Sequence, residues 1–130
     1  MQGLSLDLET SDPATEENVR RTAEVARLFN RSGLIAICAC LSPTNAGRGW
    51  ARRIAERDPG APFVEVFLDA PADVCRSRIA DRGPDGEPLA DPPYERPESA
   101  DLTLQTDQLT LEESVDRVVA LLRKSDLLPA

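Results

Sequence analysis

The chain has 130 residues, the length of a single domain, and 41% of them are apolar. Its 23 acidic and 15 basic side chains give a net charge of −8, which argues against nonspecific binding to nucleic acid or to anionic membranes. The longest apolar run, Leu34 to Leu41, is too short to cross a bilayer, and residues 1–11 lack the residue order of a signal peptide. These features predict a soluble, cytoplasmic domain with no nucleic-acid and no membrane partner.

The three cysteines are Cys38, Cys40 and Cys75, so they cannot all pair within the chain. Cys38 and Cys40 stand two apart in the apolar run, where a strand would point both side chains to one face. We therefore expect buried free thiols. The chain has no histidine and no C-x-x-C pair, so no metal site is predicted.

The first predicted element is a helix of about eighteen residues, for which Asp12 can act as the cap and Pro13 suits the first helical position. Gly33 ends it. Its apolar stripe consists of Val19, Ala23, Ala26 and Phe29, with Leu28 beside them. The spacing predicts that this face of the helix is buried.

Two adjacent arginines, Arg20 and Arg21, lie on the other face of this helix. Glu16 precedes Arg20 by four residues and Glu17 precedes Arg21 by four, which is the spacing of ion pairs on a helix surface. Such pairs explain both arginines without a ligand, so we interpret them as scaffold.

The next elements alternate between strands and helices. Gly33 to Leu41 is uniformly apolar and predicts a strand covered on both faces, as in a parallel sheet. A short helix follows, with Trp50 and Ile54 on one face, and Phe63 to Leu68 predicts a second buried strand.

The carboxyl-terminal part repeats the alternation. A helix is predicted to reach Ala80, followed by a loop over residues 81–101 and a short strand, "LTLQT". Thr110 and Glu113 form a capping box before the last helix. The expected buried stripe of that helix consists of Leu111, Val115, Val118, Val119 and Leu122. The pattern predicts an α/β fold with parallel strands.

Five stretches occur along the chain in the order EENVRRTAEVARLF, GLIAICACLSP, FVEVFLDAPADVCRSR, PYERPE and TLEESVDRVVALL. With these words the whole chain, one domain over residues 1–130, resembles the carboxyl-terminal two-thirds of the kinase domain of the adenylylsulfate kinase family. The resemblance implies a partial P-loop kinase fold, three layers with a mostly parallel sheet, lacking the first strand and the P-loop. It also implies transfer of the γ-phosphoryl group of Mg-ATP to the 3′-hydroxyl of adenylylsulfate, and a dimer.

The resemblance also carries site residues onto this chain, none of them catalytic. The set consists of Asn18, Leu41, Ser42 and Pro43 for adenylylsulfate, Asp69 near the cleft, and Arg78 and Arg82 in the nucleotide lid. Structural alternatives stay open for three of them. Asn18 can brace the first turn, Ser42 can cap a helix, and Arg78 can be solvated.

Several family features are missing. No G-x-x-x-x-G-K-[ST] loop, which would cradle the phosphates of ATP, and no D-G-D-x-x-R strand occur in the sequence. The family's G-F-S phenylalanine corresponds to Thr10, and its arginine just before the E-N-x-R-R motif corresponds to Thr15. The lid, residues 79–101, is degenerate, because from Asp81 to Asp101 seven acids face two arginines. A lid for phosphate transfer needs cations instead.

The absent phosphate-loop strand would leave the strands predicted over Gly33 to Leu41 and Phe63 to Leu68 with unpaired edges, which invites association. We expect a homodimer or a partner chain that completes the sheet, direct pairing of the strands, or a true start before Met1. The first hypothesis is a sulfate-activating kinase domain that is inactive as this chain. The alternatives are a non-catalytic module that binds a nucleotide or docks on a partner such as a sulfurylase, and one chain of a split P-loop small-molecule kinase.

Overall fold

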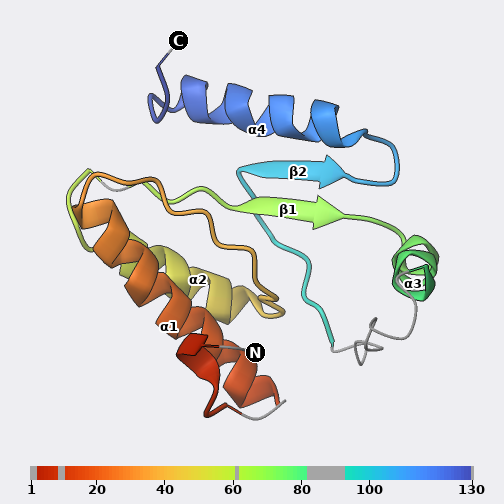
Figure 1. The fold of residues 1–130 in the computed structure, drawn as a ribbon, viewed down its shortest axis with the longest axis horizontal. Helices are drawn as coiled ribbons and strands as arrows, with labels where there is room; N and C mark the ends of the chain where they lie inside the picture. Colours follow the sequence, from red (N-terminus) through yellow and green to blue (C-terminus); the bar gives the residue numbers. More distant parts are fainter. Residues whose placement is uncertain (1–2, 9–10, 61, 82–92, 130) are drawn as a thin grey trace. The chain divides into compact units, whose positions relative to one another are not determined.

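The computed structural model describes residues 3–8, 11–60, 62–81 and 93–129. The elements are η1 (Gly3–Ser5), α1 (Asp12–Arg31), α2 (Asn45–Ala55), β1 (Val66–Asp69), α3 (Ala72–Ala80), β2 (Leu102–Gln105) and α4 (Leu111–Lys124) (Figure 1). They divide into a first unit, residues 1–63 with 91–98, and a second unit, residues 64–90 with 99–130. No helix in the described ranges is long and apolar enough to cross a membrane.

The predicted first helix is confirmed as α1, although its cap is Ser11 and not Asp12. The Ser11 hydroxyl accepts a hydrogen bond from the amide of Ala14 at 3.4 Å. Val19 and Ala23 are buried as expected, whereas the Phe29 side chain is 52% exposed. The apolar stripe is therefore covered near the start of the helix and open near its end.

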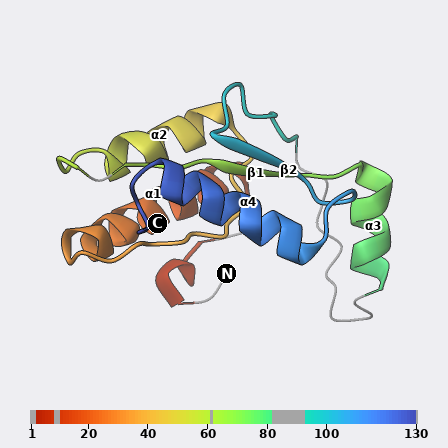
Figure 2. The ribbon, with the colours of Figure 1, turned by 90° about the horizontal axis from the view of Figure 1, so that it is seen from above.

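Helix α2 packs beside α1 in the first unit, as Figures 1 and 2 both show. Ile54 is buried at this contact, but Trp50 is 51% exposed, so the face that they share is covered only in part. An ion pair between Arg27 and Asp58, with Nε and Oδ2 2.9 Å apart, joins α1 to the turn that follows α2.

The strand predicted over Gly33 to Leu41 is wrong. The segment is extended, but Figures 1 and 2 draw it as coil, because residues 35–41 make no backbone–backbone hydrogen bond with any described residue. An extended segment becomes a strand only when a neighbour pairs with it. The prediction of buried thiols fails with it, since Cys38 and Cys40, like Cys75 of α3, are exposed.

The second unit contains the paired strands. β1 and β2 run parallel, from Val66 opposite Leu102 to Asp69 opposite Gln105, and Leu104 is only 2% exposed. This confirms parallel pairing and the strand predicted at "LTLQT". The strand predicted over Phe63 to Leu68 is shorter and later than expected, because pairing begins only at Val66.

The helices of the second unit are less buried than predicted. Both halves of the capping box are present at Thr110 and Glu113, which confirms the start of α4. No residue of α4 or α3 is buried, however, and Leu111 is 82% exposed. The predicted buried stripe of α4 is therefore wrong in its first half. The later residues of the stripe, Val118, Val119 and Leu122, are half-buried, and α4 contacts β2.

Candidate functional site

The loop over Leu41 to Pro43, predicted to line the substrate site, leads directly into α2. Thr44 caps this helix: its hydroxyl oxygen accepts from the amide of Gly47 at 3.0 Å and donates to a carboxylate oxygen of Glu16 at 3.0 Å. The cap approaches so closely that a Cβ on Gly47 would lie 3.1 Å from the Thr44 hydroxyl. Ser42 is thus not the helix cap, and the end of the loop is held to α1.

A buried arginine, Arg48, holds the other side of this loop. It is 7% exposed, and its guanidinium donates to the backbone carbonyl of Ser42 and to the side-chain carbonyl of Asn45. It also donates to the backbone carbonyl of Glu95 at 2.6 Å. Sequence analysis missed Arg48, although a lone arginine on the first turn after a capped helix start could have suggested it.

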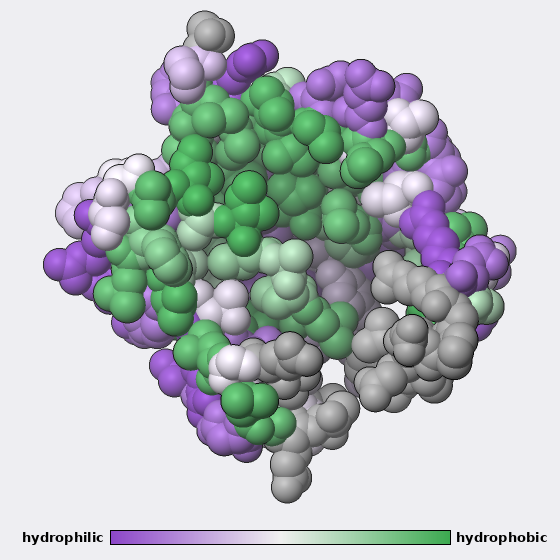
Figure 3. Space-filling model, in the orientation of Figure 1, coloured by the Kyte–Doolittle hydropathy of each residue, from purple (hydrophilic) through white to green (hydrophobic). Residues whose placement is uncertain are grey.

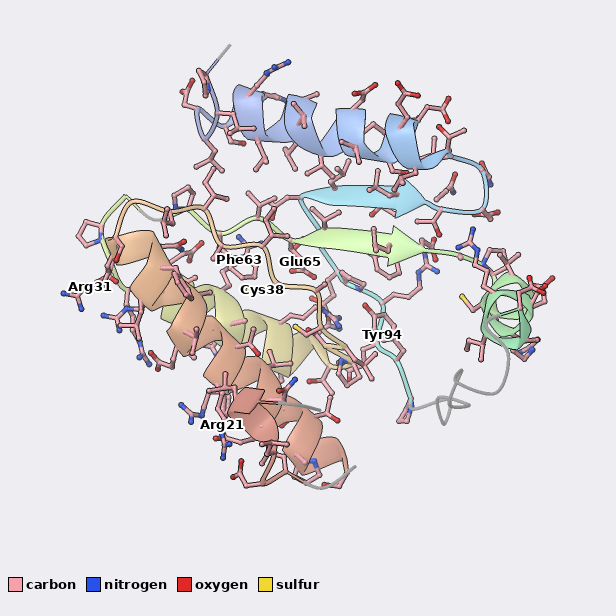
Figure 4. All side chains as sticks on the ribbon, in the orientation of Figure 1. Arg21, Arg31, Cys38, Phe63, Glu65 and Tyr94 are labelled. Atoms are coloured by element: carbon pink, nitrogen blue, oxygen red, sulfur yellow. The ribbon has the colours of Figure 1, made fainter. Side chains whose placement is uncertain are left out.

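The segment "PYERPE", residues 93–98, is fixed against the same loop. The amide of Glu95 donates to the carbonyl of Pro43 at 2.8 Å, and the Glu95 carboxylate accepts from the amide of Asn45 at 2.7 Å. The Tyr94 ring, labelled in Figure 4, lies with its centroid 5.4 Å from the guanidinium carbon of Arg48. Loop, helix start and this segment therefore form one connected cluster in the first unit.

Asn18 lies on α1 and faces η1. The hydroxyl of Ser5, which is 2% exposed, donates to the side-chain carbonyl oxygen of Asn18 at 2.6 Å. Among the described residues the side-chain amide nitrogen of Asn18 makes no hydrogen bond. One end of this side chain is thus structural, while its donor end is available to a ligand.

The adjacent arginines of α1 are both engaged in ion pairs. Arg21 bonds Glu17 at 2.8 Å, as predicted, and reaches Asp7 at 2.6 Å beyond η1 (Figure 4). Arg20 pairs with Glu17 at 2.7 Å; the predicted pair with Glu16 is wrong, because the Glu16 carboxylate accepts from Thr44. Hydrogen bonds from Arg20 and then Arg21 lower the pKa of Glu17 to about 2.

The second unit holds the remaining predicted positions. Arg78 of α3 donates to the hydroxyl of Thr106 at 3.0 Å and to its carbonyl at 2.6 Å. The amide of Thr106 in turn donates to the carbonyl of Asp69 at 2.8 Å. Arg78 is therefore exposed but not merely solvated, and it is tied with Asp69 around the end of β2. Arg82 lies outside the described residues.

The described residues do not fit Mg-ATP. Glycines with positive φ occur at Gly3, Gly33 and Gly60, which are far apart in the chain and form no single phosphate-binding loop. The sequence has one lysine, Lys124, at the end of α4. No group of three or more His, Cys, Asp or Glu side chains in the described part of the chain could hold a metal ion. Nothing here matches the glycine-rich loop and lysine that bind a triphosphate.

Comparison with known families decides the relationship. The family model for adenylylsulphate kinase matches residues 1–105. The chain belongs to the adenylylsulfate kinase family. The adenylyl-sulfate kinase of Marinobacter nauticus is 37% identical over 134 residues, which cover 97% of this chain and 66% of that protein. The chain spans about two thirds of the length of the curated relatives that it matches.

Solved structures place this adenylylsulfate kinase family chain in the P-loop kinase fold, of which it forms a part. The APS kinase CysC of Mycobacterium tuberculosis, in complex with AMPPNP and APS, superimposes with a TM-score of 0.79 and 33% identity, covering 93% of this chain and 73% of that one. The hexameric APS kinase from Thiobacillus denitrificans gives a TM-score of 0.72 and 28% identity, with 96% and 21% covered.

Proposed function

We propose that this chain is the acceptor-binding part of an adenylylsulfate kinase, which binds adenylylsulfate but transfers no phosphate as these 130 residues alone. The observation that carries the proposal is the unequal state of the two half-sites. The loop before α2 is capped by Thr44, braced by Arg48 and covered by Tyr94 and Glu95. The described residues offer no corresponding cradle for a triphosphate.

In this proposal the ligand meets Asn18 and the loop residues Leu41 to Pro43. The Asn18 amide donates to the nucleotide, and the half-buried Ser42 offers its hydroxyl and its backbone amide. Pro43 is buried and Leu41 is 45% exposed, so the loop presents both an anchored end and an open apolar surface. A preorganised loop of this kind loses little conformational entropy when it binds.

The family reaction, transfer of the ATP γ-phosphoryl group to the 3′-hydroxyl of adenylylsulfate, then depends on a phosphate loop supplied from elsewhere. The transferring group develops negative charge that needs cations around it. Arg78, which the resemblance assigns to the nucleotide lid, lies among the described residues of the second unit. Thr106 holds its guanidinium at the end of β2. We propose that Arg78 and Arg82 serve the nucleotide only when such a loop is present.

Titration calorimetry with adenylylsulfate and, separately, with Mg-ATP tests the proposal. We expect saturable heat from adenylylsulfate and none from Mg-ATP. Asn18→Ala should abolish the first signal, and Asn30→Ala, on the same helix, should leave it intact. Because Asn18→Ala also removes the bond from Ser5, Ser5→Ala is the matched variant that loses the brace but keeps the amide donor. The proposal is contradicted if adenylylsulfate releases no heat, or if the chain alone turns over ATP.

A second candidate is one chain of a split P-loop kinase, and the exposed apolar segment of residues 34–41 favours it. In that case Mg-ATP should bind only after a second chain is added. The Thiobacillus denitrificans relative is a hexamer, which supports self-association of this chain as well. A purely non-catalytic docking module should release no heat with either nucleotide. A sulfurylase partner stays a prediction.

A further inference from the structure

A hollow with a volume of about 280 Å³ lies between α1 and α2 in the first unit. Its lining consists of Arg20 and Glu24 from α1 and of Trp50, Arg53, Ile54 and Arg57 from α2 and the turn after it. Figure 3 shows apolar side chains gathered on one face of the molecule, whereas most side chains around this hollow are charged. None of the predicted site residues belongs to the lining, so the hollow is separate from the candidate acceptor site.

The hollow also has an apolar part, which α2 supplies. Ile54 is 5% exposed, whereas Trp50, one turn before it on the helix, is 51% exposed. An open indole is a large, flat and mostly apolar surface. Tryptophan and arginine are also the residues most enriched at the energetic centres of protein–protein interfaces. This part of the hollow therefore suits a large apolar side chain from a partner.

The carboxylates near the hollow are already paired with arginines. Glu17 binds Arg20 at 2.7 Å, and Glu24 binds Arg57 at 3.0 Å. Both guanidiniums keep N–H groups that are not hydrogen-bonded in the described part of the chain. Arg53 forms no hydrogen bond or ion pair with any described residue. The hollow therefore carries a surplus of positive charge, centred on Arg53.

A glycine gives the Arg53 side chain its position. A Cβ on Gly49 would lie 3.4 Å from Nη1 of Arg53, so the guanidinium lies back along α2, over the residue next to Trp50. Glycine inside a helix is destabilising relative to alanine. At this position it lets a free cation lie against the helix beside the indole. Cation and apolar surface are thus presented together.

We propose that this hollow docks an acidic segment of another protein, with one large apolar side chain against Trp50 and carboxylates on Arg53 and its neighbours. The planar fork of a guanidinium matches the two oxygens of a carboxylate, and arginine clusters recognise acidic motifs in this way. The chain has a net charge of −8, which repels an acidic partner over most of its surface. The local surplus at Arg53 therefore determines where such a partner docks. Nucleic acid needs a denser set of free cations than this hollow offers.

The test uses the full chain and a synthetic peptide in which about three Glu and Asp residues stand on each side of one Phe. Trp50 is the single tryptophan of the chain, so its fluorescence reports on the hollow directly. We expect a saturable shift of its emission to shorter wavelength, because the peptide covers the indole. Arg53→Met should weaken binding about tenfold. The matched control is Arg31→Met, an exposed arginine at the end of α1 that is labelled in Figure 4, and its affinity should be unchanged.

Two further measurements complete the test. A peptide with Gln and Asn in place of its acids should bind at least about tenfold more weakly. Trp50→Leu removes the reporter, so its expected loss of affinity is measured by anisotropy of a dye-labelled peptide. The inference is overturned by an unchanged emission, by equal affinity of Arg53→Met, or by equal binding of the uncharged peptide. A shift that appears without peptide as the chain is concentrated also overturns it, since a second copy then fills the hollow. Asn18→Ala should leave peptide binding intact, which separates this inference from the proposed function.

Discussion

Two apolar runs of this chain have the same sequence signature and different outcomes. Val66 to Asp69 forms β1, because β2 pairs with it along its whole length. Leu34 to Leu41 is longer and entirely apolar, yet no described strand pairs with it. The difference lies in the neighbours rather than in the residues. An apolar run indicates that a segment is suited to a sheet, and only a partner makes it a strand.

The two units are stabilised differently as a consequence. In the second unit the ladder of β1 and β2 places Leu104 in the interior. In the first unit no ladder is present among the described residues. Helices α1 and α2 pack there with buried apolar residues such as Val19 and Ile54, and polar contacts add to this packing. Arg48 bonds the loop before α2, and Glu16 bonds Thr44 across the two helices. The predictions below therefore compare the loss of stability at the buried strand pair with the loss at exposed side chains and at polar contacts.

The largest expected effect is at Leu104. Leu104→Ala should lower the free energy of unfolding by about 2–5 kcal/mol, because it opens a cavity under the strand pair. Ile37→Ala, at a side chain that is 89% exposed, should change it by less than about 0.5 kcal/mol. Urea unfolding followed by circular dichroism measures both. A similar loss for the two variants would mean that the extended segment is already covered in solution.

A smaller loss is expected at Arg48 in the first unit. Arg48→Met keeps much of the side-chain volume but leaves the carbonyls of Ser42 and Glu95 without this donor. The cost should be about 2–3 kcal/mol in urea unfolding, because the bonds come from a buried charged group. Arg53→Met, at an exposed position of α2, is the control and should cost under about 0.5 kcal/mol. Equal losses for the two variants would mean that the hydrogen bonds of Arg48 do not stabilise the cluster.

Local sequence signals predicted the helices well. The capping box at Thr110 and the pairing of Glu17 with Arg21 depend only on residues three or four apart, so spacing reveals them. The strand at 33–41 and the burial of the apolar stripes depend on what covers them, which spacing does not report. Arg48 was missed for the same reason, since its partner Glu95 lies 47 residues away.

The same distinction between local and long-range information applies to the site residues. The five stretches that resemble the family identified the loop Leu41 to Pro43, but they did not predict the contacts that hold it. The structural contact of Asn18 is a hydrogen bond from Ser5, a residue outside those stretches. Whether the predicted residues bind a nucleotide stays a prediction.

A cap in the second unit should matter less than either interior site. Thr110→Ala removes the hydroxyl that accepts from the amide of Glu113 at 3.2 Å and should cost about 1 kcal/mol. Since α4 has no fully buried residue, the loss of this cap is not masked by close packing around the start of the helix. Ser125→Ala, at the other end of α4, is the control. Circular dichroism measures the helix content of both variants, and urea unfolding measures their midpoints. Equal helix content and equal midpoints for the two variants would contradict the expectation.

The smallest effect is expected from the ion pairs that Glu17 makes with Arg20 and Arg21 on α1. Arg20 and Arg21 lower the pKa of Glu17 from its ordinary 4.5 to about 2, so its ionised form stabilises the fold above pH 4.5. That contribution is lost as the pH falls from 4.5 toward 2. Glu17→Gln should therefore flatten the fall in stability over this range, which urea unfolding at several pH values measures. Glu112→Gln, in α4, should keep the original slope. An unchanged slope in Glu17→Gln, or a carboxyl titration of Glu17 by NMR near 4.5, would show that these exposed pairs do not form in solution.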